Sequence, residues 1–431
     1  MTLLLIMVVI SYADKAVLGL AAKPIMHDLH LNTGQYGLVS SGFFLLYSVS
    51  AVIVGFVANR VSTKRVLLVL AIVWAFTQLP MAGPAIGFGT LLASRITLGA
   101  AEGPTNPIAT HAAFAWYPNR QRSLPSALIN VAGTLGVVIT APLLAFVIHD
   151  FGWHRAFFSL FAIGMVWVVI WGLFGQDGPM AATTSADAAP SADRADEPAV
   201  PYRRILFTGS WFGAFASAFA SYWTIALGLA WLPPYLEDVL GYSSSTAATL
   251  IALPAAAAGV LILTQGVVTQ SLMRRGTSSR IARGIIGGTA VTTAGMAMVL
   301  FVLVPGNGLK LPLMAIAFSL GLISLAIGQT VAAEITPTRQ RSAILAITAG
   351  LVTVAGLISP YVTGKIIEVS AEPATGYRIA FILSGVLMLL CGAYSLCVIH
   401  PERDARRLGI RHEEAESEKP AHESLGDLHT P

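Results

Sequence analysis

The chain consists of long apolar stretches separated by short polar loops, without the strict alternation that marks membrane β-strands. A helix of about 20 apolar residues crosses the hydrocarbon layer and satisfies its own backbone hydrogen bonds there. The pattern therefore predicts an all-α integral membrane protein and excludes an outer-membrane barrel. We expect twelve transmembrane helices, six on each side of a polar segment, at residues 2–23, 36–59, 65–84, 87–115, 121–147, 153–175, 206–236, 244–269, 281–304, 309–334, 339–367 and 376–400.

A repeat at an offset of 219 residues divides these spans into two halves. The stretch W-Y-P-N-R-Q-R-S (116–123) returns as I-T-P-T-R-Q-R-S (335–342), and the apolar segments around both copies correspond. Repeats of this size indicate two homologous membrane bundles, and a transport pathway commonly lies between them. We predict four parts: an N-terminal six-helix bundle (1–175), a linker (176–205), a C-terminal six-helix bundle (206–400) and a tail (401–431).

Composition and charge support this assignment and add an orientation. The chain is 55% hydrophobic and 11% charged, whereas soluble proteins carry about 25% charged residues. Most of the 26 Lys and Arg residues fall in loops that share one side of the membrane. By the positive-inside rule, we expect both termini to be cytoplasmic. We also expect the protein to lie in the inner (plasma) membrane. The net charge of +4 reflects this bias, so we expect no nucleic-acid partner.

The linker and the tail are polar and lack apolar periodicity. The linker is rich in Ala, Ser, Asp and Pro, and the tail from Pro401 is rich in charged residues. Segments of this composition bury too little apolar surface to fold alone. We therefore expect both to be solvated and to act only as tethers.

Four ionisable side chains lie near the middle of predicted spans, Asp14 and Lys15 in the first span and Arg95 and Glu102 in the fourth. A charge near the bilayer centre costs about 2.5–3.5 kcal/mol, and charged residues tolerated there commonly have a function. Arg95 and Glu102 are two helical turns apart and project from one face. We expect the four groups to surround a water-accessible, charge-balanced cavity.

The residues around the fourth-span acid predict its packing. Gly99, Ala100 and Gly103 allow a neighbouring helix to approach closely. Pro104 and Pro107 follow the acid directly and would bend the helix just beyond it.

Two interpretations of the buried charges stay open. The four groups could simply pair and hold the first and fourth spans together. Alternatively, the cations bind an anion while Asp14 and Glu102 exchange protons, which suits coupling to a proton gradient. Four uncharged polar side chains within spans are candidate substrate contacts, or else interhelical hydrogen bonders: Tyr12, Tyr47, Asn130 and Gln329.

The chain resembles the major facilitator superfamily over its whole length, and within it the anion:cation symporter family. The resemblance is carried by S-Y-A-D-K-A-V-L (11–18), S-R-I-T-L-G-A-A-E-G-P-T-N-P (94–107), W-Y-P-N-R-Q-R-S (116–123) and G-W-H-R-A-F (152–157). It implies twelve helices, alternating access and proton-coupled uptake of a small organic anion, such as a sugar acid or an aromatic carboxylate.

The resemblance also implies roles for residues at matching positions. Asp14 and Glu102 correspond to the protonatable acids of the family, and Arg95 to the arginine that binds the substrate carboxylate. Tyr12 and Tyr47 correspond to tyrosines that line the pocket.

The chain departs from the family pattern at two places. Lys15 stands where the family usually has Arg, and an ammonium lacks the planar fork of a guanidinium, so bidentate recognition would fall to Arg95. The loop after the second span has Asn59 and Ser62 where the superfamily pattern has an acid and a glycine.

Three function classes follow from these observations. The first is a proton:organic-anion symporter, the second is an organic-anion exchanger or uniporter whose acids only partner the cations, and the third is a non-transporting membrane sensor. An enzyme is not expected, because no nucleophile–base or metal-ligand set lies at membrane depth. The expected partners are a small organic carboxylate, protons and the lipid bilayer. We expect a monomer that needs no cofactor or metal.

Overall fold

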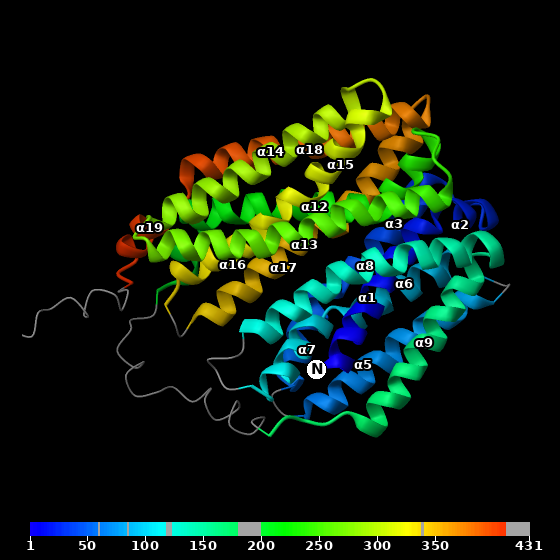
Figure 1. The fold of residues 1–431 in the computed structure, drawn as a ribbon, viewed down its shortest axis with the longest axis horizontal. Helices are drawn as coiled ribbons and strands as arrows, with labels where there is room; N and C mark the ends of the chain where they lie inside the picture. Colours follow the sequence, from blue (N-terminus) through cyan, green and yellow to red (C-terminus); the bar gives the residue numbers. More distant parts are fainter. Residues whose placement is uncertain (59–60, 84–85, 118–122, 180–199, 338–339, 411–431) are drawn as a thin grey trace, which may run out of the picture.

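A computed structural model describes residues 1–58, 61–83, 86–117, 123–179, 200–337 and 340–410, and regular secondary structure in these ranges is entirely helical. The helices of the first half are α1 (Thr2–Leu20), α2 (Ala22–Asp28), α3 (Thr33–Leu45), α4 (Tyr47–Ala58), α5 (Thr63–Gln78), η1 (Leu79–Ala82), α6 (Phe88–Glu102), α7 (Thr105–Phe114), α8 (Ser123–Phe151) and α9 (Trp153–Phe174). Those of the second half are α11 (Tyr202–Leu206), α12 (Gly209–Asp238), α13 (Ser244–Arg274), η4 (Arg280–Ile285), α14 (Ile286–Leu303), α15 (Asn307–Ser319), η5 (Leu320–Leu322), α16 (Ile323–Glu334), α17 (Arg341–Val369), α18 (Pro373–Val398) and α19 (Pro401–Arg407). The two halves form two bundles that lie side by side (Figure 1).

Eleven helical segments of the described chain are long and apolar enough to cross a membrane, and they coincide with eleven of the twelve predicted spans. The remaining span, predicted at 87–115, divides into α6 and α7 at Gly103 and Pro104. Proline supplies no backbone N–H donor and obstructs the preceding helical turn, so α6 ends at Glu102. The helix is therefore interrupted at the place where the bend was predicted, just beyond this acid.

The small residues of α6 bring its backbone against α3 and α4. A Cβ atom on Gly99 would lie 1.7 Å from the carbonyl oxygen of Phe43, and one on Gly103 would lie 1.9 Å from that of Tyr47. No side chain fits at either position, so the close helix approach predicted for these glycines is confirmed.

Two seams join the halves, and they correspond to each other under the sequence repeat. Helix α3 packs along α17, and α8 packs along α13. The repeat places α8 and α17 at equivalent positions, and both helices have 29 residues and one interior proline, Pro142 and Pro360, at the same place. Each seam therefore contains one member of this equivalent pair, α8 or α17, packed against a helix of the other half.

The halves are sealed against each other at the end that carries α2. The Lys23 ammonium lies 2.6 Å from an Asp238 carboxylate oxygen. The Thr33 hydroxyl donates a hydrogen bond to the Gly364 carbonyl at 3.0 Å, and the Trp231 indole N–H donates to the Pro360 carbonyl at 3.0 Å. We call this region the sealed end.

At the opposite end, acidic side chains hold the first turns of three helices. After α9, the Asp177 carboxylate accepts from the Lys64 backbone N–H of α5 at 2.8 Å. After α18, the Glu402 carboxylate accepts from the Ser279 N–H, which precedes η4, at 2.6 Å. Asp404 accepts from the Ser210 N–H of α12 at 3.0 Å. Carboxylates are favoured at such positions, because the first N–H groups of a helix have no intrahelical acceptor.

Residues 401–410 of the tail and 200–205 of the linker are packed, so the expectation that both segments are solvated tethers is wrong for these residues. Asp404 is 2% exposed, and Ala405 and Ile410 are buried in an apolar cluster with Trp211 of α12. Burial raises the pKa of the Asp404 carboxyl, but the hydrogen bonds from Ser210 and Arg403 outweigh it and hold this pKa below its ordinary value. The central part of the linker, 180–199, and the tail from 411 lie outside the described residues.

The sealed end predicts a position-specific effect of adding a methyl group. A Cβ atom on Gly19 of α1 would lie 1.9 Å from the Leu229 carbonyl oxygen of α12, whereas one on Gly172 of α9 would have no neighbour within 4 Å. We expect Gly19→Ala to lower the free energy of unfolding by about 1–3 kcal/mol through overpacking. Gly172→Ala should raise it slightly, because alanine favours helix. Thermal unfolding in detergent measures both; equal melting temperatures for the two variants would contradict the close contact.

Candidate functional site

An ion pair joins α1 to α6 inside the first half. The Lys15 ammonium lies 3.1 Å from a Glu102 carboxylate oxygen, and it donates a hydrogen bond to the Ser11 hydroxyl at 2.9 Å. Ser11 lies one turn earlier on α1 and donates to the same Glu102 oxygen at 3.1 Å. The three side chains form a closed triangle, with Glu102 fully buried.

A second chain of contacts links the other acid to the other cation. The Gln78 side-chain amide donates to the Asp14 carboxylate at 2.7 Å, and its carbonyl accepts from the Arg95 guanidinium at 2.7 Å. The guanidinium also lies over the Phe157 ring, 5.1 Å from its centroid. Gln78, at the end of α5, thus connects Asp14 to Arg95, and Phe157 fixes the guanidinium from the other side.

Each buried acid has one oxygen without a hydrogen-bond partner in the described structure. These atoms are Oδ2 of Asp14 and Oε1 of Glu102, and the Nε of Arg95 is in the same situation. Buried polar atoms are almost always paired, so such exceptions need a reason. Each of these carboxylate oxygens is a candidate position for a proton or for an ordered water molecule.

Aromatic rings surround the Lys15 ammonium. It lies 4.5 Å from the ring centroid of Tyr12 and 5.8 Å from that of Tyr47. Faces of aromatic rings attract cations, so both rings favour a charged Lys15.

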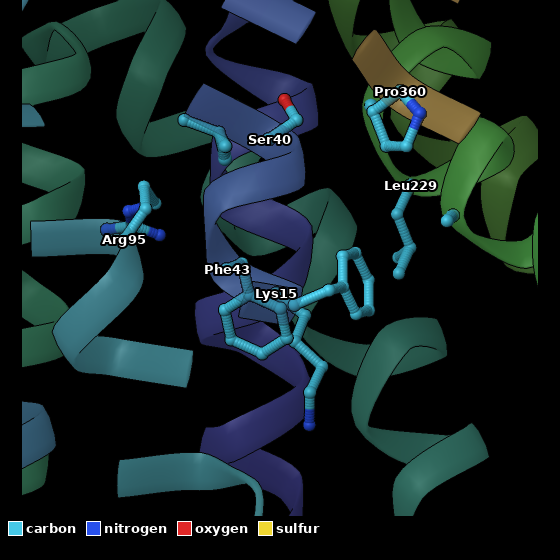
Figure 2. Close-up of a pocket in the computed structure, with 10 residues that line it drawn as sticks. Lys15, Ser40, Phe43, Arg95, Leu229 and Pro360 are labelled. Carbon is cyan, nitrogen blue, oxygen red and sulfur yellow. The ribbon is translucent and has the colours of Figure 1, made fainter. Parts of the chain in front are cut away.

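Lys15 also lines two cavities between the halves. The larger has a volume of about 420 Å³ and lies between α1, α8, α12, α13 and the α15–α16 region. The smaller, of about 30 Å³, is lined by Lys15, Arg95 and residues of α3, α12 and α17. Figure 2 shows this smaller cavity, in which the Lys15 ammonium points away from Arg95.

The structure places most of the predicted site residues in one region. Asp14, Lys15, Arg95 and Glu102 form the cluster described above, and Tyr12 and Tyr47 adjoin it. Gln329 of α16 lines the larger cavity from the second half. The side chain of Asn130 lies outside the described residues.

The expected cavity shared by all four charged groups differs from the one observed. Lys15 alone of the four lines the larger cavity, with 13% of its side chain exposed. Asp14 and Arg95 are each 1% exposed, and Arg95 reaches only the smaller cavity. The cause is local, because Gln78 and Phe157 bind the guanidinium within the first half.

Sequence reasoning did not identify Gln78, Ser11 or Phe157 as members of the site. Gln78 carried a usable signal, since an amide within an otherwise apolar span needs a hydrogen-bond partner. Ser11 precedes Lys15 by one helical turn, which is the spacing of side-chain neighbours. Phe157 ends the G-W-H-R-A-F motif, but nothing in the sequence indicated that its ring contacts the Arg95 guanidinium.

Comparisons with known proteins agree with this architecture. Residues 4–326 match the model of the Major Facilitator Superfamily. The chain is 29% identical over 409 residues to a probable sulfoacetate transporter of Cupriavidus necator, with 92% of each chain covered. It is 26% identical to a hexuronate transporter of Bacillus subtilis, covering 91% of this chain and 92% of that protein.

Solved structures show the same fold. A bacterial homologue of the human lysosomal transporter Spinster, in an inward-facing and unoccupied conformation, superposes with a TM-score of 0.77 at 18% identity, covering 94% of this chain and 97% of that chain. A D-xylose-proton symporter superposes with a TM-score of 0.74 at 15% identity, covering 94% and 98%. The superfamily resemblance read from the sequence motifs is confirmed: the chain belongs to the Major Facilitator Superfamily, a family of membrane transporters and not of enzymes.

Proposed function

We propose that the protein is a secondary active transporter that takes up a small organic anion together with protons by alternating access. One observation carries the proposal: the Lys15 ammonium lines the cavity between the halves while it is paired with the buried Glu102 at 3.1 Å. The relatives named as sulfoacetate and hexuronate transporters support an anionic substrate.

Glu102 and the substrate carboxylate compete for one cation. Two unit charges at this separation attract each other by on the order of 5 kcal/mol at an effective dielectric constant of about 20. Protonation of Glu102 removes that attraction and leaves the Lys15 charge for the substrate. Because each 1.4 kcal/mol changes an affinity about tenfold, the competition is strong enough to couple proton binding to anion binding.

Asp14 is the second proton site of the proposal, and Arg95 the second anion contact. While Asp14 is ionised, Gln78 holds it together with Arg95. Protonation of Asp14 weakens this chain and frees the guanidinium, which lines the smaller cavity together with Lys15. Both cations then act on the same anionic group, and Tyr12, Tyr47, Asn130 and Gln329 complete the contacts.

The orientation and the assembly state are part of the proposal. Arg274 and Arg280 lie at the end opposite the sealed end, where the positive-inside rule places the cytoplasm. We infer that the protein lies in the inner (plasma) membrane with both termini in the cytoplasm. The sealed end then faces away from the cytoplasm, which corresponds to an inward-facing conformation. The repeat supplies both sides of the pathway within one chain, which supports a monomer.

Glu102→Gln tests the proton coupling. The amide keeps the shape of the side chain but cannot release a proton, so we expect anion binding and exchange to persist while proton-driven accumulation is lost. Substrate uptake and internal pH are measured together in proteoliposomes. Unchanged accumulation would remove Glu102 from the mechanism. Wild-type uptake without proton movement would instead favour the exchanger or uniporter.

Lys15 substitutions test the anion contact. Lys15→Gln removes the charge and leaves Glu102 without a cation, so we expect anion affinity to fall about 10–100-fold, as for lost hydrogen bonds to a charged group. Lys15→Arg keeps the charge and should bind within about tenfold of wild type. Calorimetric titration of the purified protein measures both. A folded Lys15→Gln variant with wild-type affinity would contradict the assignment.

Arg95→Ala tests the second cation. We expect at least a tenfold loss of anion affinity, with part of it restored in Arg95→Lys. Arg155→Ala, on an exposed arginine at the start of α9, is the matched control and should bind normally. Melting temperatures of the variants separate loss of binding from loss of fold. Full affinity in Arg95→Ala would remove the guanidinium from the substrate contacts.

A further inference from the structure

We infer that the site takes an acid with one anionic group and an apolar body about the size of a ring, in preference to a sugar acid or an acid with two anionic groups. The inference rests on the proposed function and narrows its substrate class. The charges, the walls and the size of the larger cavity support it.

The cavity offers positive charge at one place only. Lys15 is the single charged side chain among the described residues that line it. Arg95 lines only the smaller cavity, so it adds no second positive group to the walls of the larger one. A second carboxylate or sulfonate at the far end of the bound molecule would lose its water and find no cation in the cavity wall, which is unfavourable.

The walls opposite Lys15 are apolar. Leu229 and Leu232 of α12, Ile251 of α13, Phe318 of α15 and Leu325 of α16 all line the cavity. These side chains neither donate nor accept hydrogen bonds. They favour a molecular body that leaves water readily, such as an aromatic ring or a compact hydrocarbon.

The polar capacity of the cavity is small. Apart from Lys15, three polar side chains with hydrogen-bonding groups are found among its described lining residues, Tyr12, Thr134 and Gln329, and they come from three different helices. Every ring hydroxyl of a sugar acid needs a partner once it is buried, and sites that select hydroxylated substrates supply these partners. The wall residues cannot supply them.

The cavity is large enough for a ring with a short acidic arm. An apolar cavity of about 150 Å³ holds benzene, and the cavity beside Lys15 measures about 420 Å³. The Lys15 charge on one side and the apolar walls on the other orient the bound acid. Its anionic group meets Lys15 on α1, and its body lies against α12, α13 and the α15–α16 region.

A direct comparison of the binding affinities of three acids tests the inference. The full-length protein in detergent at pH 7 is titrated by calorimetry with phenylacetate, sulfoacetate and galacturonate. Phenylacetate has one charge and a ring, sulfoacetate has two charges, and galacturonate has several hydroxyls. We expect phenylacetate to bind at least tenfold more tightly than either of the others.

Two variants locate the preference in the cavity. Leu325→Asn places an amide in the apolar wall and should weaken phenylacetate binding at least tenfold. Thr134→Val removes a lining hydroxyl with little change of shape and should leave phenylacetate affinity within about threefold. Their melting temperatures without ligand confirm that both are folded.

The outcomes separate this inference from the proposed function. Equal or tighter binding of sulfoacetate or galacturonate overturns the preference and leaves an organic-anion transporter in place. A loss of phenylacetate binding in Thr134→Val, or no loss in Leu325→Asn, overturns it as well. Binding of none of the three acids contradicts the proposed function itself, and the inference with it.

Discussion

The buried ion pair between Lys15 and Glu102 is the constraint on which the rest of the site depends. It joins α1 to α6, and Ser11 is hydrogen-bonded to both partners. Removing one partner from a buried pair leaves an uncompensated charge, which is strongly unfavourable. Lys15 is therefore stabilised by an anion beside it, and the fully buried Glu102 by either a cation or a proton. In the proposed cycle, the substrate and the proton take these two roles together.

The two halves share a fold but differ in chemistry. Helices α8 and α17 match in length and in the place of their proline, and the seams they form are equivalent. The charged cluster, however, comes entirely from the first half, whereas the second half supplies most of the apolar wall of the cavity. The architecture of a repeat is fixed by helix packing, while the side chains that face the cavity are free to diverge.

The sequence alone predicted how deep the charged residues lie in the membrane, but not the direction in which their side chains point. Apolar periodicity located the spans, and the cost of buried charge identified Asp14, Lys15, Arg95 and Glu102, which the structure brings together. Which way a side chain turns about its helix depends on partners far along the chain. Gln78 and Phe157 turn Arg95 away from the larger cavity, and neither contact follows from local spacing.

The packing of the tail also depends on partners that are distant in the sequence. A polar composition predicts a solvated segment when it is considered alone. Asp404 and Glu402 become structural only because Ser210 and Ser279 present backbone N–H groups nearby, at helix starts distant in the sequence. Contacts of this kind depend on the assembled fold.

The carboxylates Asp177 and Glu402 have a mechanical consequence. Each follows the last long helix of its half and is bonded to the first turn of the third one, α5 and the η4–α14 helix. This hydrogen bond ties the end of the last long helix to the start of the third one and opposes fraying of the helices at that face. In the proposed alternating-access cycle, halves tied in this way would favour a rocking movement about the two seams over deformation inside either bundle.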